Sequence, residues 1–176
     1  MRNLLRLPAF AHPDTVHVIV ESPRGATVKL KYDMALGAMS ISRPLSLGLS
    51  FPYDWGFVPS TLGADGDPLD AVVLWDVSTY PGVVISCHAV ALIKVEQQAG
   101  ENRRIRNDRL ILRPLAARRE SELPSAAAIS PRVRAELAAF LLASTALEGK
   151  DAQILGWDGP EAVIDLIRAS LVEGES

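Results

Sequence analysis

The chain has 176 residues, and its 18 Lys and Arg against 21 Asp and Glu give a formal net charge of −3 at pH 7. This length fits a single domain covering residues 1–176, and the slight negative charge excludes a protein that binds nucleic acid through overall positive charge. The 48% hydrophobic residues exclude extensive disorder, the single cysteine excludes an internal disulfide, and no apolar run approaches the roughly 18 residues of a membrane-spanning helix. We therefore expect a cytoplasmic protein.

The first part of the chain has the alternation of β-strands. Apolar and polar residues alternate over residues 16–21 and again over 26–32, with turn residues between them. In the second of these strands Lys29 and Lys31 share a face. A shorter strand is expected at 38–43, and a long loop rich in Gly, Pro and aromatic residues at 47–68.

The rest of the chain changes from strands to helices. Strands rich in Val, Ile and Leu are expected at 71–75 and 83–95. Apolar residues at spacings of three and four then predict an amphipathic helix that begins at Pro131 and ends before Gly149, and a second from Pro160 to Leu171. Strands followed by helices indicate an α+β protein that is mainly β, with helices packed outside a small closed sheet.

The segment DGDPLD at residues 65–70 carries three carboxylates within six residues. Such closely spaced carboxylates repel one another unless a positive charge lies among them, and oxygen ligands of this kind suit Mg²⁺. The alternative is a solvated turn whose aspartates accept bonds from nearby backbone N–H groups. A chance match to D-G-D-P-x-D is expected in about one chain in ten thousand of this length, so we prefer the metal site.

Residues 51–70, FPYDWGFVPSTLGADGDPLD, closely resemble the signature of the family I soluble inorganic pyrophosphatases. Glu21, Lys29 and Arg43 match the family's upstream site positions in type and spacing, so the resemblance extends over nearly the whole chain. It implies a five-stranded OB-like closed β-barrel with flanking C-terminal helices. It also implies Mg²⁺-dependent hydrolysis of inorganic diphosphate to two phosphates, and a homo-oligomer, commonly a hexamer in bacteria.

In that family, Mg²⁺ ions bridge the acidic residues and the diphosphate, water attacks one phosphorus, and Lys and Arg hold the phosphate oxygens. Transferred to the matching positions here, the resemblance assigns six roles: Asp65 and Asp70 as metal ligands, Glu21 in the outer metal shell, Asp67 as the base for the nucleophilic water, and Lys29 and Arg43 as phosphate binders.

The chain departs from the family pattern at a second acidic segment, which reads Asp, four residues, Asp, then Lys two residues later. We align this segment with Gln97, Asn102 and Arg104, so that both carboxylates become amides. The amide oxygen of Asn102 still suits Mg²⁺ but brings no charge. Arg104, in the place of the family lysine, is expected to bind substrate.

Other departures concern single positions. Lys31 replaces a family glutamate, and Phe51 and Trp55 replace site tyrosines, of which Trp55 keeps one N–H donor for the substrate. The Tyr-Lys pair of the C-terminal helix falls on Ser144 and Thr145. Together these changes make the site about three charge units more positive than the family pattern. We therefore expect fewer Mg²⁺ ions than the family pattern, with Lys31 and nearby arginines supplying part of the missing positive charge, and weakened hydrolysis.

Two other functions remain open at this stage. One is a catalytically inactive homologue that binds diphosphate, phosphate or a nucleotide, and the other is a phosphohydrolase acting on another phosphoanhydride. A run of seven arginines bears on the second: Arg103, Arg104, Arg106, Arg109, Arg113, Arg118 and Arg119. Such a run either extends an anion site or forms a solvated loop or a contact between subunits. It does not favour nucleic acid, because no aromatic residues are interleaved with the arginines.

Overall fold

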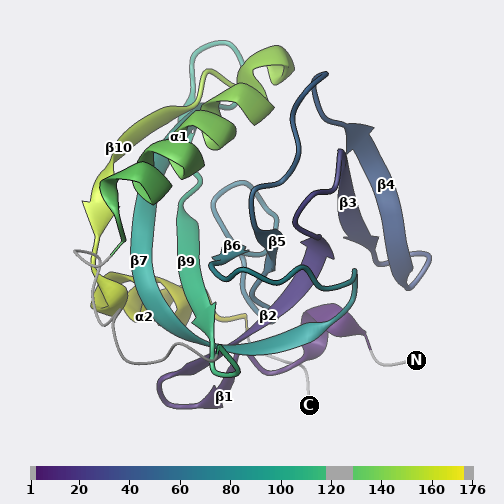
Figure 1. Ribbon diagram of the computed structural model, residues 1–176, viewed down its shortest axis with the longest axis vertical. Helices are drawn as coiled ribbons and strands as arrows, with labels where there is room; N and C mark the ends of the chain where they lie inside the picture. Colours follow the sequence, from purple (N-terminus) through teal and green to yellow (C-terminus); the bar gives the residue numbers. More distant parts are fainter. Residues whose placement is uncertain (1–2, 118–128, 173–176) are drawn as a thin grey trace.

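The computed structural model describes residues 3–117 and 129–172, and it is mainly β-sheet with two helices in the C-terminal part (Figure 1). The strands are β1 Phe10–His12, β2 Thr15–Ser22, β3 Val28–Asp33, β4 Ala38–Pro44, β5 Asp54–Phe57, β6 Asp70–Val73, β7 Val84–Gln98, β8 Arg104–Arg106, β9 Arg109–Pro114 and β10 Gln153–Asp158. The helices are α1 Pro131–Thr145 and α2 Pro160–Ala169, with the 3-10 turns η1 Leu4–Arg6 and η3 Ala146–Glu148.

Most strands belong to one eight-stranded sheet, in which β7 is the central element. This strand pairs with β2, β9, β10 and β8 along its length. The β2 strand also pairs with β5, which pairs with β6, and β6 runs parallel to β9. The pairings therefore lead from β2 through β5, β6, β9 and β7 back to β2.

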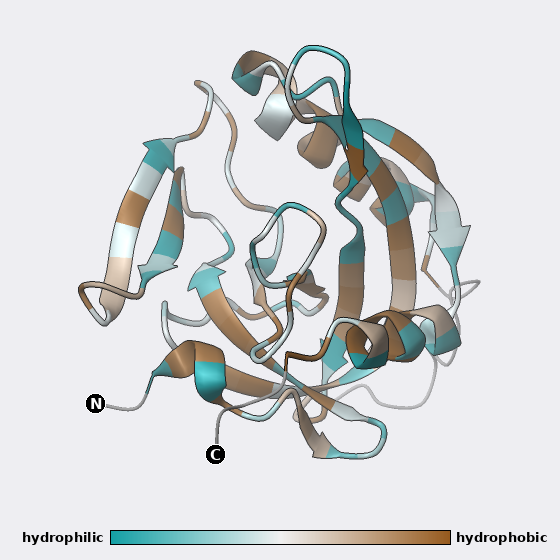
Figure 2. Cartoon of the chain, turned by 180° about the vertical axis from the view of Figure 1, so that it is seen from behind, coloured by the Kyte–Doolittle hydropathy of each residue, from teal (hydrophilic) through white to brown (hydrophobic). Residues whose placement is uncertain are grey.

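Strands β3 and β4 form a separate two-stranded sheet beside the larger one (Figure 1). Lys29 of β3 pairs with Arg43 of β4, and Lys31 pairs with Ser40. Figure 2 shows hydrophilic and hydrophobic bands alternating along this hairpin. The alternation places Lys29 and Lys31 on one face, as the sequence predicted.

The two helices cover different parts of the core. Val163 and Ile167 of α2 are fully buried in a cluster that includes Val18 of β2 and Leu112 of β9. Helix α1 buries Leu137, Phe140 and Leu141 in a second cluster, which includes Phe51, Trp55 and Ile93. No helix within the described ranges combines the length and apolarity needed to cross a bilayer.

The helix boundaries follow from local chemistry. The hydroxyl of Ser130 accepts a hydrogen bond from the N–H of Val133, and Pro131 stands at the first helical position, where its missing N–H costs nothing. The predicted helix reaching Gly149 ends as an α-helix at Thr145 and continues as the turn η3. Gly149 follows with a φ of 65°, which favours glycine.

The predicted loop at 47–68 contains β5, which the sequence analysis did not predict. This strand is only four residues long and includes Asp54 and Gly56, two residue types that are rare in strands. Asp54 is fully buried, and it accepts bonds from the N–H of Arg24 at 2.8 Å and from the hydroxyl of Thr79 at 2.6 Å. These long-range partners stabilise a buried charge that local sequence disfavours.

Gly56 allows β5 to approach β2 closely. A Cβ added at Gly56 would lie 1.9 Å from the carbonyl oxygen of Ile19, which is backbone and cannot move aside cheaply. We expect Gly56→Ala to lower the free energy of unfolding by about 3 kcal/mol or more, measured by urea denaturation. Gly25→Ala is the control, because its Cβ would meet no atom within 4 Å and it suffers only the strain of a φ of 84°, about 1 kcal/mol. Equal losses in the two variants would contradict this account.

Candidate active site

The acidic loop, residues 63–70, ends in the first residue of β6. Just before the loop, the N–H of Ser60 donates to the carbonyl of Leu5 in η1, and the N–H of Leu62 donates to the carbonyl of Ser170 after α2. The N–H of Gly63 donates to the carbonyl of Asp67 at 2.8 Å, and the N–H of Asp67 donates to Oδ1 of Asp65 at 3.2 Å. Gly66 supplies a φ of 87° at the tip. Asp70 begins β6 opposite Phe57. The loop therefore presents its three carboxylates from a short, internally bonded turn.

Each carboxylate of the acidic loop has a partner from another part of the chain. Nζ of Lys31 lies 2.6 Å from Oδ2 of Asp67. The amide of Asn107 donates to Oδ2 of Asp65 at 2.9 Å, and Nη1 of Arg109 lies 2.9 Å from Oδ2 of Asp70. Two cations and an amide thus offset a repulsion that the sequence analysis expected metal ions to offset.

The three contacts differ in their exposure to water. In the Lys31–Asp67 pair the side chains are 41% and 57% exposed, so the pair contributes little to stability and can open readily. In the Arg109–Asp70 pair the values are 8% and 23%, so removing one partner would leave a largely buried charge. Asp67 is therefore the carboxylate most easily released from its cation.

Strands β2 and β3 bring Glu21 and Lys29 to the same site. Glu21 accepts a hydrogen bond from the N–H of Tyr32 at 2.8 Å. Burial raises the pKa of Glu21 to about 7, and the negative charge of Asp70 adds to the rise, whereas the Tyr32 bond opposes it. Burial lowers the pKa of Lys29, an effect that Asp70 opposes and that Lys31 reinforces. Both residues therefore interact electrostatically with the acidic loop.

Arg43 of β4 reaches across to the end of α1. Its Nη2 donates to the carbonyl of Ser144 at 2.8 Å, and its guanidinium pairs with the carboxylate of Glu148. The other oxygen of that carboxylate lies 2.9 Å from Nζ of Lys150. The predicted phosphate binder Arg43 is thus held beside a further lysine that the sequence analysis did not select.

The second acidic segment lies differently from our alignment. Asn102 is exposed in the turn between β7 and β8, and Arg104 contacts Glu96 at 2.9 Å and Asp151 at 2.8 Å rather than the acidic loop. Gln97 is buried in β7. The structure does not bring Asn102 or Arg104 to the three aspartates.

Asn107 and Arg109 lie where we expected Asn102 and Arg104. Both pairs read Asn-x-Arg, so residue type and spacing alone do not distinguish them. Arg109, however, is followed directly by Leu110, Ile111 and Leu112, which are fully buried in β9. This apolar run is the signal that could have identified the pair that contacts the acidic loop, because it fixes the second Asn-x-Arg at the start of a core strand.

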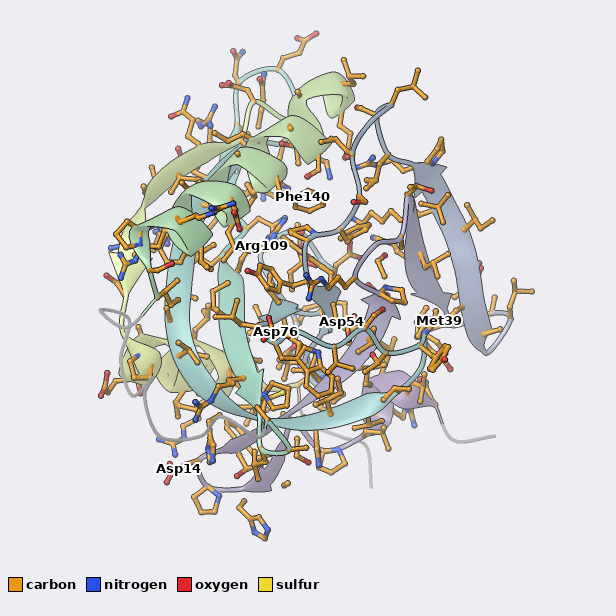
Figure 3. All side chains as sticks on the ribbon, in the orientation of Figure 1. Asp14, Met39, Asp54, Asp76, Arg109 and Phe140 are labelled. Atoms are coloured by element: carbon orange, nitrogen blue, oxygen red, sulfur yellow. The ribbon has the colours of Figure 1, made fainter. Side chains whose placement is uncertain are left out.

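The aromatic residues of the loop form a core beneath the cations. Trp55 packs against Phe51 and Phe140, with ring centroids 5.9 and 5.7 Å apart, and it is 8% exposed. The guanidinium carbon of Arg109 lies 5.9 Å from the centroid of Trp55. Figure 3 labels Arg109 and Phe140 on the side of the sheet that α1 covers. Trp55 therefore supports Arg109, which differs from the expected role as a substrate donor.

The arginine run is largely engaged within the chain. Arg104 and Arg109 have the carboxylate partners given above, Arg106 pairs with Asp108 at 2.8 Å, and Arg113 also has an interaction partner. Arg118 and Arg119 lie outside the described residues. Among the described arginines of the run, Arg109 contacts the acidic loop, whereas Arg104, Arg106 and Arg113 interact with other parts of the chain.

The side chains at the acidic loop are oxygen donors of the kind that Mg²⁺ prefers. In the ranges 3–117 and 129–172, no three His, Cys, Asp or Glu side chains lie together as a ready metal site. Asp65 and Asp70, together with the amide oxygen of Asn107, still provide a donor set suited to a hard cation. The residues at the acidic loop thus fit Mg²⁺ as a hard cation with oxygen ligands.

Comparison with known proteins gives a consistent result. Residues 18–173 match the family model for inorganic pyrophosphatase. The chain is 34% identical to an inorganic pyrophosphatase of Thermus thermophilus over 97% of both chains, and 32% identical to one of Nostoc over 96% of this chain and 97% of the other. A crystal structure of an inorganic pyrophosphatase from Thermus thermophilus superposes with a TM-score of 0.87 at 32% identity, covering 96% and 97% of the two chains.

The raised pKa of Glu21 predicts a pH-dependent stability of the metal-free protein. The pKa of Glu21 is about 7 in the folded state against an ordinary value of 4.5, so the folded state holds the proton more tightly than the unfolded state. The resulting contribution to stability is fully present below pH 4.5 and is lost as the pH rises through 7. We expect Glu21→Gln to equal the parent chain near pH 4 and to exceed it by about 1–3 kcal/mol at pH 8. Urea denaturation across this range, with chelator present, tests the prediction, and a constant difference would contradict it.

Proposed function

The chain belongs to the inorganic pyrophosphatase family, and we propose that it hydrolyses inorganic diphosphate to two phosphates at the acidic loop. The observation that carries this proposal is the contact of Asp67 with Lys31 of β3 and of Asp70 with Arg109 of β9, in a loop that also carries Asp65. Carboxylates suit Mg²⁺ and fixed cations suit phosphate oxygens, so the two sets together fit a metal-assisted reaction on a phosphoanhydride.

Mg²⁺ is the metal that this proposal requires, in smaller number than the family pattern. Asp65 and Asp70 would hold it, with the amide oxygen of Asn107 as a neutral third ligand once that amide turns from its bonds to Asp65 and Arg109. Bound Mg²⁺ neutralises developing negative charge and lowers the pKa of water. Glu21 would support the site from its outer shell.

Asp67 is our candidate for the base that accepts a proton from the attacking water. Its carboxylate is more exposed than that of Asp70, and among the residues that the structure describes its cationic partner is Lys31. While that pair is closed, Lys31 occupies Oδ2 of Asp67, and Oδ1 is the oxygen left to accept a proton from water. A lysine in the place of the family glutamate thus favours slow hydrolysis, because its positive charge opposes the transfer of a proton to the carboxylate.

The phosphate oxygens would be held by Lys29, Arg43 and Arg109. Arg109 takes the role that we first assigned to Arg104, since it lies at the acidic loop. Its Nε is buried and has no hydrogen-bond partner among the described residues. A buried N–H without an acceptor is costly, and a phosphate oxygen or water would satisfy it.

The remaining parts of the proposal rest on the family resemblance. We propose that the closed series of strand pairings β2–β5–β6–β9–β7–β2 forms a five-stranded OB-like barrel, and that the chain is a single domain. We also expect a homo-oligomer, a hexamer by resemblance, acting in the cytoplasm.

A binding role without hydrolysis is the second candidate. The observation that favours it is the occupation of all three aspartates by Lys31, Asn107 and Arg109. These fixed groups bind anions but do not generate a nucleophile. The two candidates separate on whether diphosphate is cleaved.

Asp67→Asn tests the base. We expect phosphate release from diphosphate in the presence of Mg²⁺ to fall at least about 1,000-fold, because an amide cannot accept the proton. The control is Asp14→Asn, the same change in the turn between β1 and β2 on the far side of the molecule (Figure 3), and it should retain the parent rate. Equal, background rates in all three proteins would support the binding role.

Asn107→Asp tests the revised position of the second acidic segment. The added carboxylate would repel Asp65 in the metal-free protein and attract Mg²⁺, so we expect tighter Mg²⁺ binding and faster hydrolysis, each by about tenfold. Lys31→Glu in the same chain should increase both effects. Asn102→Asp is the matched control, since it makes the same chemical change in an exposed turn. If Asn102→Asp raises Mg²⁺ affinity and Asn107→Asp does not, the original alignment is the correct one.

A further inference from the structure

The end of α1 contributes no charged side chain to the site. Ser144 and Thr145 stand where the family has a Tyr-Lys pair, and both of their hydroxyls bond back to the carbonyl of Leu141 at 3.0 Å. Only the backbone carbonyl of Ser144 contacts a site residue, Arg43. The phosphate contact expected from a lysine at position 145 is therefore missing.

Lys150 lies close to this gap, although it is five residues further along the chain. Its Nζ is 2.9 Å from Glu148, whose second oxygen pairs with Arg43. Burial lowers the pKa of Lys150, and the positive charges of Arg109 and Lys31 lower it further. Lys150 thus belongs to the same group of cations as the proposed phosphate binders.

Glu148 holds two of these cations side by side. Its side chain is 18% exposed, and it is the carboxylate shared by Arg43 and Lys150. Two positive side chains with one carboxylate between them keep a net positive charge. An anion that approaches this pair meets donors already placed near each other, which lowers the entropic cost of binding.

The loop that carries Lys150 is fixed by contacts on both sides of it. The N–H of Gln98 donates to the carbonyl of Lys150 at 2.6 Å. Asp151 has a φ of 37°, which is uncommon for a residue other than glycine. Arg104 holds Asp151 through Nη1 to Oδ2 at 2.8 Å and through Nη2 to the carbonyl at 2.7 Å. The β7–β8 hairpin thereby fixes the backbone at Lys150.

We propose that Lys150 is a phosphate-binding residue for diphosphate that replaces the lysine missing at position 145. Glu148 orients Lys150 and Arg43, and Arg104 is a positioning residue that acts through Asp151 rather than by touching substrate. The proposal rests on the proposed diphosphate site and names a further residue of that site.

Lys150→Gln tests the contact directly. We expect the affinity for diphosphate, measured by calorimetry with and without Mg²⁺, to fall about ten- to a hundredfold, and KM to rise in step while kcat changes less. Lys94→Gln is the matched control, because Lys94 pairs with Asp158 between β7 and β10. Equal affinities in Lys150→Gln and the parent chain would overturn the proposal. The calorimetric arm decides this even if the parent chain cleaves no diphosphate, a result that would count against hydrolysis alone.

Two further variants separate positioning from a general loss of structure. Arg104→Gln should raise KM in the same direction as Lys150→Gln, and the double variant should be no worse than Lys150→Gln alone, because both changes act through one contact. Thr145→Lys combined with Lys150→Gln should recover most of the lost affinity. Additive effects of Arg104→Gln and Lys150→Gln, or failure of Thr145→Lys to restore binding to a folded protein, would contradict the assigned roles.

Discussion

The organisation of the site depends on how three carboxylates within six residues are kept together. Asp65, Asp67 and Asp70 repel one another, and in this chain the compensation comes from side chains on other strands. That requirement explains why β3 and β9 must converge on the acidic loop. It also links folding to function, because the groups that neutralise the loop are the groups that would meet a phosphate.

The sequence predicts this loop well because its chemistry is local. Three aspartates, two glycines, a proline and a following apolar run are sufficient to identify the loop and its strand. The alternation of β2, β3 and β7 is equally local, and their predicted ranges agree with the structure to within about three residues. Lys31, which the sequence analysis identified as a replacement of a family glutamate, contacts Asp67.

The parts that the sequence does not predict depend on contacts between distant residues. β5 is stabilised by the buried partners of Asp54, which come from segments more than twenty residues away. The choice between Asn102 and Asn107 depends on the length of the hairpin between β7 and β8, which the sequence marks only through the apolar run after Arg109. Lys150 belongs to no motif that the sequence analysis identified. Its position beside the site follows from its contact with Glu148, which also pairs with Arg43.

The buried pair between Arg109 and Asp70 affects how far the charge of the site depends on the concentration of metal ions. A divalent ion occupies its ligands according to its free concentration, so a site neutralised by metals is emptied and refilled as that concentration changes. A guanidinium is attached to the chain and keeps its charge at every physiological pH. The part of the site's positive charge that arginine and lysine carry is therefore fixed when the protein is made, and only the part that bound metal would add follows the supply of metal.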